Sequence, residues 1–189
     1  LDSNLDINDY LIEIIRSYKE ISEKKYVYEN KDFKKKIKIS KSSEIIYGLR
    51  NFIGNANKFS KSKVVITLIS NNTHTEIIIK DDGPGFPEDL IEKHRLGEPY
   101  IRSVSQKNIS KYGLGLGTFI GKTLLEKNYA NIGFLNSVED KGAEVKIKWQ
   151  NRVSIDRGIN EVINWYHKYS NKFEKKDEKF SINKWKITS

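Results

Sequence analysis

The sequence predicts an α/β fold, a two-layer sandwich in which a mixed β-sheet is covered on one face by about three helices. Segments with helical periodicity alternate along the chain with pairs of short β-rich segments, and this order favours a mixed sheet with helices packed against it. The 189 residues are also enough to bury a sizeable core without metal or disulfide support. We expect one domain over residues 1–150 and a helical, basic C-terminal extension over residues 151–189.

The individual elements follow from periodicity, caps and turn residues. Helical segments repeat apolar side chains every three or four residues, whereas strand segments alternate or are rich in β-branched residues. Serine before an apolar periodic run is an N-cap signal, and Asn30-Lys31-Asp32 has the composition of a turn. In chain order we expect a helix over 7–21, a strand pair over 25–30 and 34–39, and a second helix that is N-capped by Ser42 or Ser43 and runs to Phe59. A hairpin over 64–69 and 75–80 and an irregular segment over 82–112 follow. The last expected elements are a helix over 117–127, a strand pair over 132–136 and 143–149, and a short helix over 154–169.

The net charge of +9 raises the question of an anionic partner, for which nucleic acid is the first candidate. Two stretches, 19–41 and 151–189, carry the whole excess of basic residues, and the rest of the chain is balanced. Lysines in these stretches are interleaved with Glu and Asn rather than gathered with aromatic residues. We do not expect specific nucleic-acid binding, although a basic nucleic-acid-binding domain remains a competing hypothesis.

Several classes of protein are disfavoured by what the sequence lacks. The absence of cysteine excludes disulfides, Cys-ligated zinc and thiol chemistry, and the three histidines share no metal-ligand spacing. No apolar run is long enough to span a bilayer, and the polar N-terminal residues do not form a signal peptide. The numbering begins without methionine, so upstream segments could hold membrane spans. We expect a cytoplasmic domain, anchored at the inner membrane only through such segments.

The helix expected up to Phe59 carries a polar stripe. Asn51, Asn55 and Lys58 lie at positions i, i+4 and i+7, within about 60° of one another at 3.6 residues per turn. Gly48 and Gly54 flank the stripe and leave it uncrowded. Neutral amide oxygens are suited to a hydrated Mg²⁺ and its phosphates, while a plain solvated face is the alternative explanation.

Two glycine-containing segments add to this stripe. Asp81-Asp82-Gly83-Pro84-Gly85-Phe86 follows an apolar strand, where a carboxylate could accept a hydrogen bond from an amine such as that of adenine. Ordinary turn chemistry would also explain it.

Gly113-Leu114-Gly115-Leu116-Gly117-Thr118 opens a helix, whose first N–H groups and dipole favour an anion. Its spacing matches neither the P-loop nor the dinucleotide-binding fingerprint.

The order and spacing of these three motifs resemble the ATP-binding domain of histidine kinases, within the class that includes gyrase, Hsp90 and MutL. Further matching segments resemble the RegB/PrrB redox-responsive sensor kinases in particular. These segments are Tyr47-Gly48-Leu49-Arg50-Asn51, Asp81 to Phe86, Leu96-Gly97-Glu98-Pro99-Tyr100, the helix from Thr118 to Glu126 and the strand over 142–149. The resemblance covers residues 1–150 and implies ATP and Mg²⁺ as ligands.

Site roles are carried over from the resemblance motif by motif. It implies that Asn55 ligates Mg²⁺, that Asn51 and Lys58 contact phosphates or the waters of the metal, and that Asp81 accepts from the adenine amino group. It also implies that residues 86–112 form a lid over the nucleotide. The remaining implied contacts are with the base and sugar, from Gly83 and Gly85, and with the phosphates, from Gly113, Leu114, Gly115, Leu116, Gly117 and Thr118.

The implied activity is transfer of the γ-phosphate of ATP to a histidine. Relatives that hydrolyse ATP carry a glutamate base four residues before the Mg²⁺-binding asparagine, whereas this chain has Asn51, which cannot take up a proton at neutral pH. No histidine here has the acidic neighbour of a phosphoacceptor, and the redox cysteine of RegB-like kinases is absent. The resemblance therefore implies dimerisation helices outside this chain as the acceptor, a homodimeric full-length kinase and a downstream response regulator. A nucleotide-binding regulatory domain without phosphotransfer is the alternative.

Overall fold

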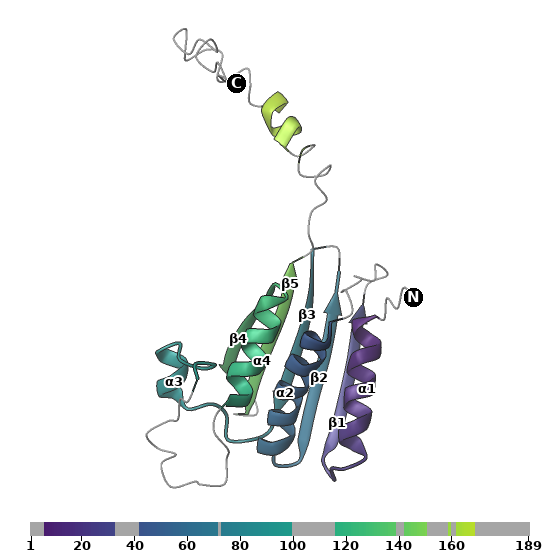
Figure 1. Cartoon of the computed structure of the whole chain (residues 1–189), viewed down its shortest axis with the longest axis vertical. Coiled ribbons are helices and arrows are strands. Elements are labelled where there is room, and N and C mark those ends of the chain that lie inside the picture. The colour runs from purple at the N-terminus through teal and green to yellow at the C-terminus, as the bar shows by residue number, and fades with distance from the viewer. Residues whose placement is uncertain are drawn as a thin grey trace. The chain divides into compact units, whose positions relative to one another are not determined.

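Five strands form one mixed sheet in the order β1-β2-β3-β5-β4 (Figure 1). The computed structural model describes residues 6–32, 42–71, 73–99, 116–138, 142–150, 159 and 162–168. β1 runs parallel to β2, and the other neighbouring strands are antiparallel. The strands are β1 (Lys25–Asp32), β2 (Lys63–Ser70), β3 (His74–Asp81), β4 (Ala130–Asn136) and β5 (Ala143–Gln150).

Three helices cover one face of this sheet, which confirms the predicted two-layer α/β sandwich (Figure 1). They are α1 (Ile7–Lys19), α2 (Ser43–Phe59) and α4 (Leu116–Lys127). Strands β2 and β3 alternate buried and partly exposed residues, so that one face of each strand meets the helices. The fully buried side chains include Leu11, Leu49, Phe52, Ile53, Ile66, Ile77, Leu125 and Ile147.

The helix boundaries follow from their caps. The Asp6 side chain accepts a hydrogen bond from the Asn8 amide at the start of α1. The Ser42 hydroxyl accepts one from the Glu44 amide at 3.2 Å, so Ser42 rather than Ser43 caps α2. The periodic segments predicted as helices over 7–21, 43–59 and 117–127 are therefore confirmed to within two residues at their ends.

The predicted turn at Asn30-Lys31-Asp32 is wrong. These three residues continue β1 and pair in parallel with Leu68 to Ser70 of β2. Their polar composition resembles a turn, but a strand at the edge of a sheet tolerates polar residues because it is partly exposed. The second half of the predicted pair, 34–39, lies outside the described residues. The hairpin of β2 with β3 and the pairing of β4 with β5 are confirmed.

Helices α2 and α4 pack closely through glycines. A Cβ atom at Gly48 would lie 2.5 Å from Cγ of Leu125, and one at Gly121 would lie 3.2 Å from Cε2 of Phe52. A Cβ at Gly54, in turn, would lie 2.6 Å from the Tyr18 hydroxyl of α1. Neighbouring helices therefore pack against Gly48 and Gly54, and the interpretation that these glycines leave the polar stripe uncrowded is wrong.

The segment that follows β3 contains a short helix that the sequence did not predict. Helix α3 (Glu88–Glu92) begins after Pro87, and its end is closed by the His94 amide, which donates to the Ile91 carbonyl. Further on, Gly97 packs against Lys122 of α4, where a Cβ would lie 2.6 Å from Cδ of the lysine. Part of the predicted irregular segment is thus ordered against the helical layer, and residues 100–115 lie outside the described part.

The contacts of the chain divide it into two units, Leu1–Asn151 and Arg152–Ser189. The second unit is described at residues 159 and 162–168, which are helical and exposed. The rest of the predicted helix over 154–169 lies outside the described residues, so the helical extension as a whole stays a prediction. In the described parts of the chain, every helix is too short or too polar to cross a bilayer.

A strained residue at the end of α4 gives a test of the helix boundary. Tyr129 is 75% exposed and has φ of +64°, and its amide donates to the Glu126 carbonyl. A Cβ in this left-handed conformation costs about 1–2 kcal/mol, whereas glycine loses about 0.5–1 kcal/mol more chain entropy. In urea denaturation, Tyr129→Gly is therefore expected to have a free energy of unfolding up to about 1 kcal/mol higher than that of Tyr129→Ala. Tyr129→Ala, which keeps the Cβ, is the matched control, and a glycine variant less stable than the alanine variant would contradict the assigned geometry.

Candidate nucleotide site

Asp81 ends β3 with its side chain fixed at one oxygen. Its Oδ1 accepts hydrogen bonds from the amides of Gly83, at 2.8 Å, and Ala143, at 3.3 Å. Its Oδ2 accepts none from the part of the chain that the structure describes, although the residue is only 7% exposed. Burial raises the pKa of this carboxyl more than the two amides lower it. The free oxygen is thus a positioned acceptor for a donor group of a ligand.

Near Asp81, two glycines lie so close to the backbone of other residues that a side chain would not fit. A side chain at Gly83 would collide with the carbonyl oxygen of Phe59, 2.5 Å from a Cβ, at the end of α2. A side chain at Gly142 would collide with the backbone of Asp81 itself. Gly85 has φ of +78°, a left-handed conformation that suits glycine. Glycines are therefore required here for the loop after β3 to turn beneath the end of α2.

The adjacent Asp82 has a different environment and a different function. Its carboxylate accepts hydrogen bonds from the amides of Lys61, Ser62 and Lys63 and from the Ser62 hydroxyl at 2.6 Å. Burial opposes ionisation, but these hydrogen bonds outweigh it and hold the pKa of Asp82 well below its ordinary value. Asp82 therefore ties the loop after β3 to the start of β2, a structural function.

The carboxamide of Asn136 secures the same loop from the opposite side. Asn136 of β4 accepts from the Phe86 amide at 2.6 Å and donates to the Phe86 carbonyl at 2.9 Å. The Phe86 ring meets Phe134 edge-on at 5.5 Å, and Phe134 lies 5.9 Å from Phe52 of α2. This aromatic row supports the chain just beyond Gly85, so the loop is held by both strands and helix.

The polar stripe of α2 meets the first turn of α4. The Asn51 oxygen Oδ1 lies 3.3 Å from the position that a Cβ would occupy at Gly117, and its Nδ2 donates to the Tyr47 carbonyl at 2.8 Å. Asn55 donates from Nδ2 to the Thr118 hydroxyl at 3.3 Å, and its Oδ1 lies 3.8 Å from the same Gly117 position. Two amide oxygens therefore converge on Gly117, where a side chain would press against Asn51.

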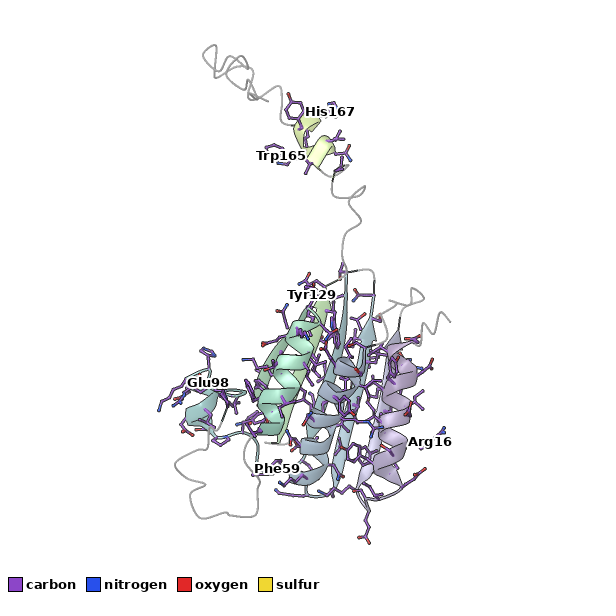
Figure 2. The ribbon with its side chains drawn as sticks, viewed as in Figure 1. Arg16, Phe59, Glu98, Tyr129, Trp165 and His167 are labelled. Atoms are coloured by element: carbon purple, nitrogen blue, oxygen red, sulfur yellow. The ribbon has the colours of Figure 1, made fainter. Side chains whose placement is uncertain are left out.

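The other predicted site residues are placed less centrally or not described. Lys58 is exposed near the end of α2, with its ammonium 5.4 Å from the centre of the Phe59 ring. Phe59 itself lies at the end of α2 where the helix approaches the Asp81 loop (Figure 2). Leu116 is half-buried in the first turn of α4. Gly113, Leu114 and Gly115 lie outside the described residues, so their predicted phosphate contacts stay predictions.

The donor set suits a cation only in company with phosphate. Asn51 and Asn55 offer neutral oxygens, and the described residues contain no cluster of three His, Asp or Glu side chains that could hold a metal ion. Mg²⁺ is usually bound through one or two protein ligands together with substrate phosphates. The residues therefore fit Mg²⁺ that arrives with a nucleotide.

Sequence reasoning missed the residues that support this site. Gly142 and Ala143 act through backbone geometry, while Asn136 and Phe134 act from a strand 50 residues away from the loop that they hold. A glycine that directly precedes a β-strand was the available signal for Gly142. No local signal marks Asn136, because its partner is the Phe86 peptide group rather than a side chain.

The class of protein follows from a comparison with known families. The family described as histidine kinase-, DNA gyrase B-, and HSP90-like ATPase matches residues 41–153, more than half of the chain. The chain therefore belongs to this ATPase family, in agreement with the motifs on α2, the Asp81 loop and the start of α4.

Individual relatives are sensor kinases. Over 106 residues the chain is 41% identical to sensor histidine kinase RegB of Cereibacter sphaeroides, covering 53% of this chain and 22% of RegB. Among solved structures, the mycobacterial sensor histidine kinase MprB matches with a TM-score of 0.63 at 21% identity, over 78% of this chain and 96% of that one. Full-length ShkA in complex with AMPPNP matches with a TM-score of 0.65 at 20% identity, over 80% and 31%. The structural likenesses establish the fold, and the chain spans about a fifth of the length of RegB.

The two neighbouring aspartates predict opposite responses to amidation. Ionised Asp81 costs stability at neutral pH, because its folded pKa is raised, so this cost is relieved as pH falls. Ionised Asp82 contributes stability above its unfolded pKa, and this is lost on acidification through its lower folded pKa. At pH 7 without nucleotide, Asp81→Asn is expected to unfold at the same urea concentration as the wild type or higher. Asp82→Asn is expected to lose about 1.5–3 kcal/mol, and equal losses in both variants would contradict the division of functions.

Proposed function

We propose that this chain is the catalytic, ATP-binding module of a sensor histidine kinase, which binds Mg-ATP and presents its γ-phosphate to a histidine outside the chain. The observation that carries the proposal is the convergence of the Asn51 and Asn55 amide oxygens on Gly117, where α2 meets the start of α4. Helix α4 directs its first N–H groups and positive dipole end to this side, which favours phosphate. Membership of the ATPase family and the sensor-kinase relatives support the same activity.

Each residue has a binding or positioning function in this proposal. The free Oδ2 of Asp81 accepts the adenine amino group, while Gly83 and Gly85 contact the base and sugar. Asn55 provides an oxygen to Mg²⁺, and Asn51 and Lys58 contact phosphate or metal-bound water. When bound, Mg²⁺ supplies charge neutralisation between the phosphates. Gly113, Leu114, Gly115, Leu116, Gly117 and Thr118 surround the phosphate end.

Asn51 favours transfer over hydrolysis. Its carboxamide does not take up a proton at neutral pH, and its Nδ2 is already committed to the Tyr47 carbonyl. A water molecule beside the γ-phosphate therefore finds no general base at this position. Phosphoryl transfer depends mainly on positioning and electrostatics, so a correctly aligned external nucleophile is the missing component.

The proposed partners follow from that missing nucleophile. They are the dimerisation and phosphoacceptor helices of the same kinase and, downstream, a response regulator. The full-length kinase would be a homodimer, and this module would lie in the cytoplasm, with any membrane anchor in upstream segments.

Nucleotide binding is tested with one variant at each end of the site. Wild type is expected to gain thermal stability with Mg-ATP and not with Mg²⁺ alone, since binding to the folded state raises the melting temperature. Asn55→Ala should keep its apo melting temperature, because alanine is the better helix former, and lose most of the Mg-ATP shift. Asp81→Asn should weaken ATP binding by about 1.5–3 kcal/mol in calorimetry, because an NH₂ group then faces the adenine amine.

Tyr129→Ala is the control for both ends, since it lies at the far end of α4 (Figure 2). Wild-type affinity in Asp81→Asn, or a collapse of apo stability in Asn55→Ala, would contradict the site. Salt-sensitive DNA binding without any response to ATP would instead support the nucleic-acid hypothesis.

Phosphotransfer is tested with ATP labelled at the γ-phosphate. The chain alone should neither become labelled nor hydrolyse ATP appreciably, because it provides no base at Asn51 and no aligned histidine. Addition of the dimerisation helices should place acid-labile label on their histidine. Label on the chain alone, or brisk hydrolysis without partner, would contradict the kinase module, and binding without transfer to the helices would favour the regulatory alternative.

A further inference from the structure

The first turn of α4 contains a hydroxyl that contacts the metal-binding asparagine. Thr118 is half-buried, and its Oγ1 accepts a hydrogen bond from Asn55 Nδ2 at 3.3 Å. The two amide atoms of Asn55 lie at nearly the same distance from the Cβ position at Gly117, 3.8 Å for Oδ1 and 3.9 Å for Nδ2. Packing against Gly117 therefore does not distinguish the two ends of the carboxamide, and Nδ2 is the end that lies within hydrogen-bond distance of the Thr118 hydroxyl. A hydroxyl that gives its own proton to another acceptor can only accept from Asn55, and this would keep Nδ2 at that position.

The hydroxyl has one proton of its own to donate. A threonine that accepts from Asn55 can still donate to a second acceptor. Within the described residues this proton has no recorded acceptor. The hydroxyl lies in the first turn of a 12-residue helix, where an incoming phosphate oxygen is favoured by the helix dipole. One side chain could thus connect the amide of the metal ligand to the anion that the metal accompanies.

We propose that Thr118 is a positioning residue that couples Mg²⁺ binding to phosphate binding. Its hydroxyl accepts from Asn55 Nδ2, so that Asn55 Oδ1 is the end available to the cation, and donates its proton to a phosphate oxygen. The inference rests on the proposed function, because it concerns the same Mg-nucleotide site. In the proposed function, the first turn of α4 contacts phosphate through its backbone N–H groups. The inference adds a function for the side chain of Thr118.

Removal of the Thr118 hydroxyl should therefore weaken the effect of Mg²⁺ on nucleotide binding. Thr118→Val keeps the branched shape and similar helix propensity but removes the hydroxyl. The Asn55 NH₂ then loses its partner when its oxygen faces the cation. Loss of such a supporting hydrogen bond typically costs about 10–100-fold in metal affinity, so the factor by which Mg²⁺ strengthens ADP binding should fall about tenfold. Thr118→Ser, which restores the hydroxyl, should stay within about twofold of wild type.

The experiment uses calorimetric titration of ADP into the full chain, with excess Mg²⁺ and with EDTA. Thr123→Val is the matched control, since it is an exposed threonine on the same helix. A second readout does not depend on nucleotide: the side-chain NH₂ resonances of Asn55 in ¹H–¹⁵N spectra of the apo protein should move in Thr118→Val and not in Thr123→Val. In an Asn55→Ala background, Thr118→Val should have no further effect on the Mg²⁺ factor.

The outcomes separate this inference from the proposed function. If wild type shows no strengthening of ADP by Mg²⁺, both are overturned. If wild type shows it and Thr118→Val retains it, only the inference is overturned. A variant that weakens ADP equally with Mg²⁺ and with EDTA would also overturn it, because Thr118 would then act on the nucleotide independently of Asn55.

Discussion

The close crossing of α2 and α4 is the constraint on which the rest of the site depends. Gly48 and Gly121 let the two helices approach so closely that a methyl group at either position would press on the other helix. This approach brings Asn51 and Asn55, in the middle of one helix, against the first turn of the other. The start of α4 is thereby held against α2, and the polar stripe of α2 becomes part of the candidate site.

Side-chain hydrogen bonds fix the position of the loop after β3. Asp82 and Asn136 hold it from two sides, through the start of β2 and the end of β4. Asp81 then uses one oxygen for the fold, and the other is the oxygen that we propose for a ligand. Burial of this carboxylate is a cost to stability that the two backbone hydrogen bonds offset only in part, and such a cost is typical of a functional site.

The sequence was sufficient for the features that are local. Periodicity and caps predicted α1, α2 and α4, because an amphipathic helix records its buried face in its own residues. The parallel pairing of β1 with β2 was missed at Asn30-Lys31-Asp32, because the partner strand is more than 30 residues away and the segment itself has turn composition. Gly48 and Gly54 were misinterpreted for a related reason. A glycine in the sequence indicates that a side chain would not fit, but it does not show which neighbouring element occupies the space.

The motif spacing indicated a candidate site through resemblance, while the different environments of its residues required the structure. Asp81 and Asp82 are identical in sequence terms, yet one is buried with a raised pKa and the other is held ionised by backbone amides. Thr118 was expected to contribute through its helix position, and only the hydrogen bond to Asn55 indicates a function for its hydroxyl. Side-chain direction at a helix crossing is not encoded in any short segment.

We propose that the metal and phosphates of a bound nucleotide lie where α2 meets the start of α4. Paramagnetic Mn²⁺ with ATP tests this most directly, because it broadens NMR signals according to their distance from the metal. The strongest broadening is expected at the amides of Gly117 and Thr118 and at the side-chain amides of Asn51 and Asn55. Broadening should decrease along α4 towards Tyr129, about 18 Å further by helical rise. Uniform broadening, or a maximum in another part of the chain, would contradict this location of the metal and phosphates.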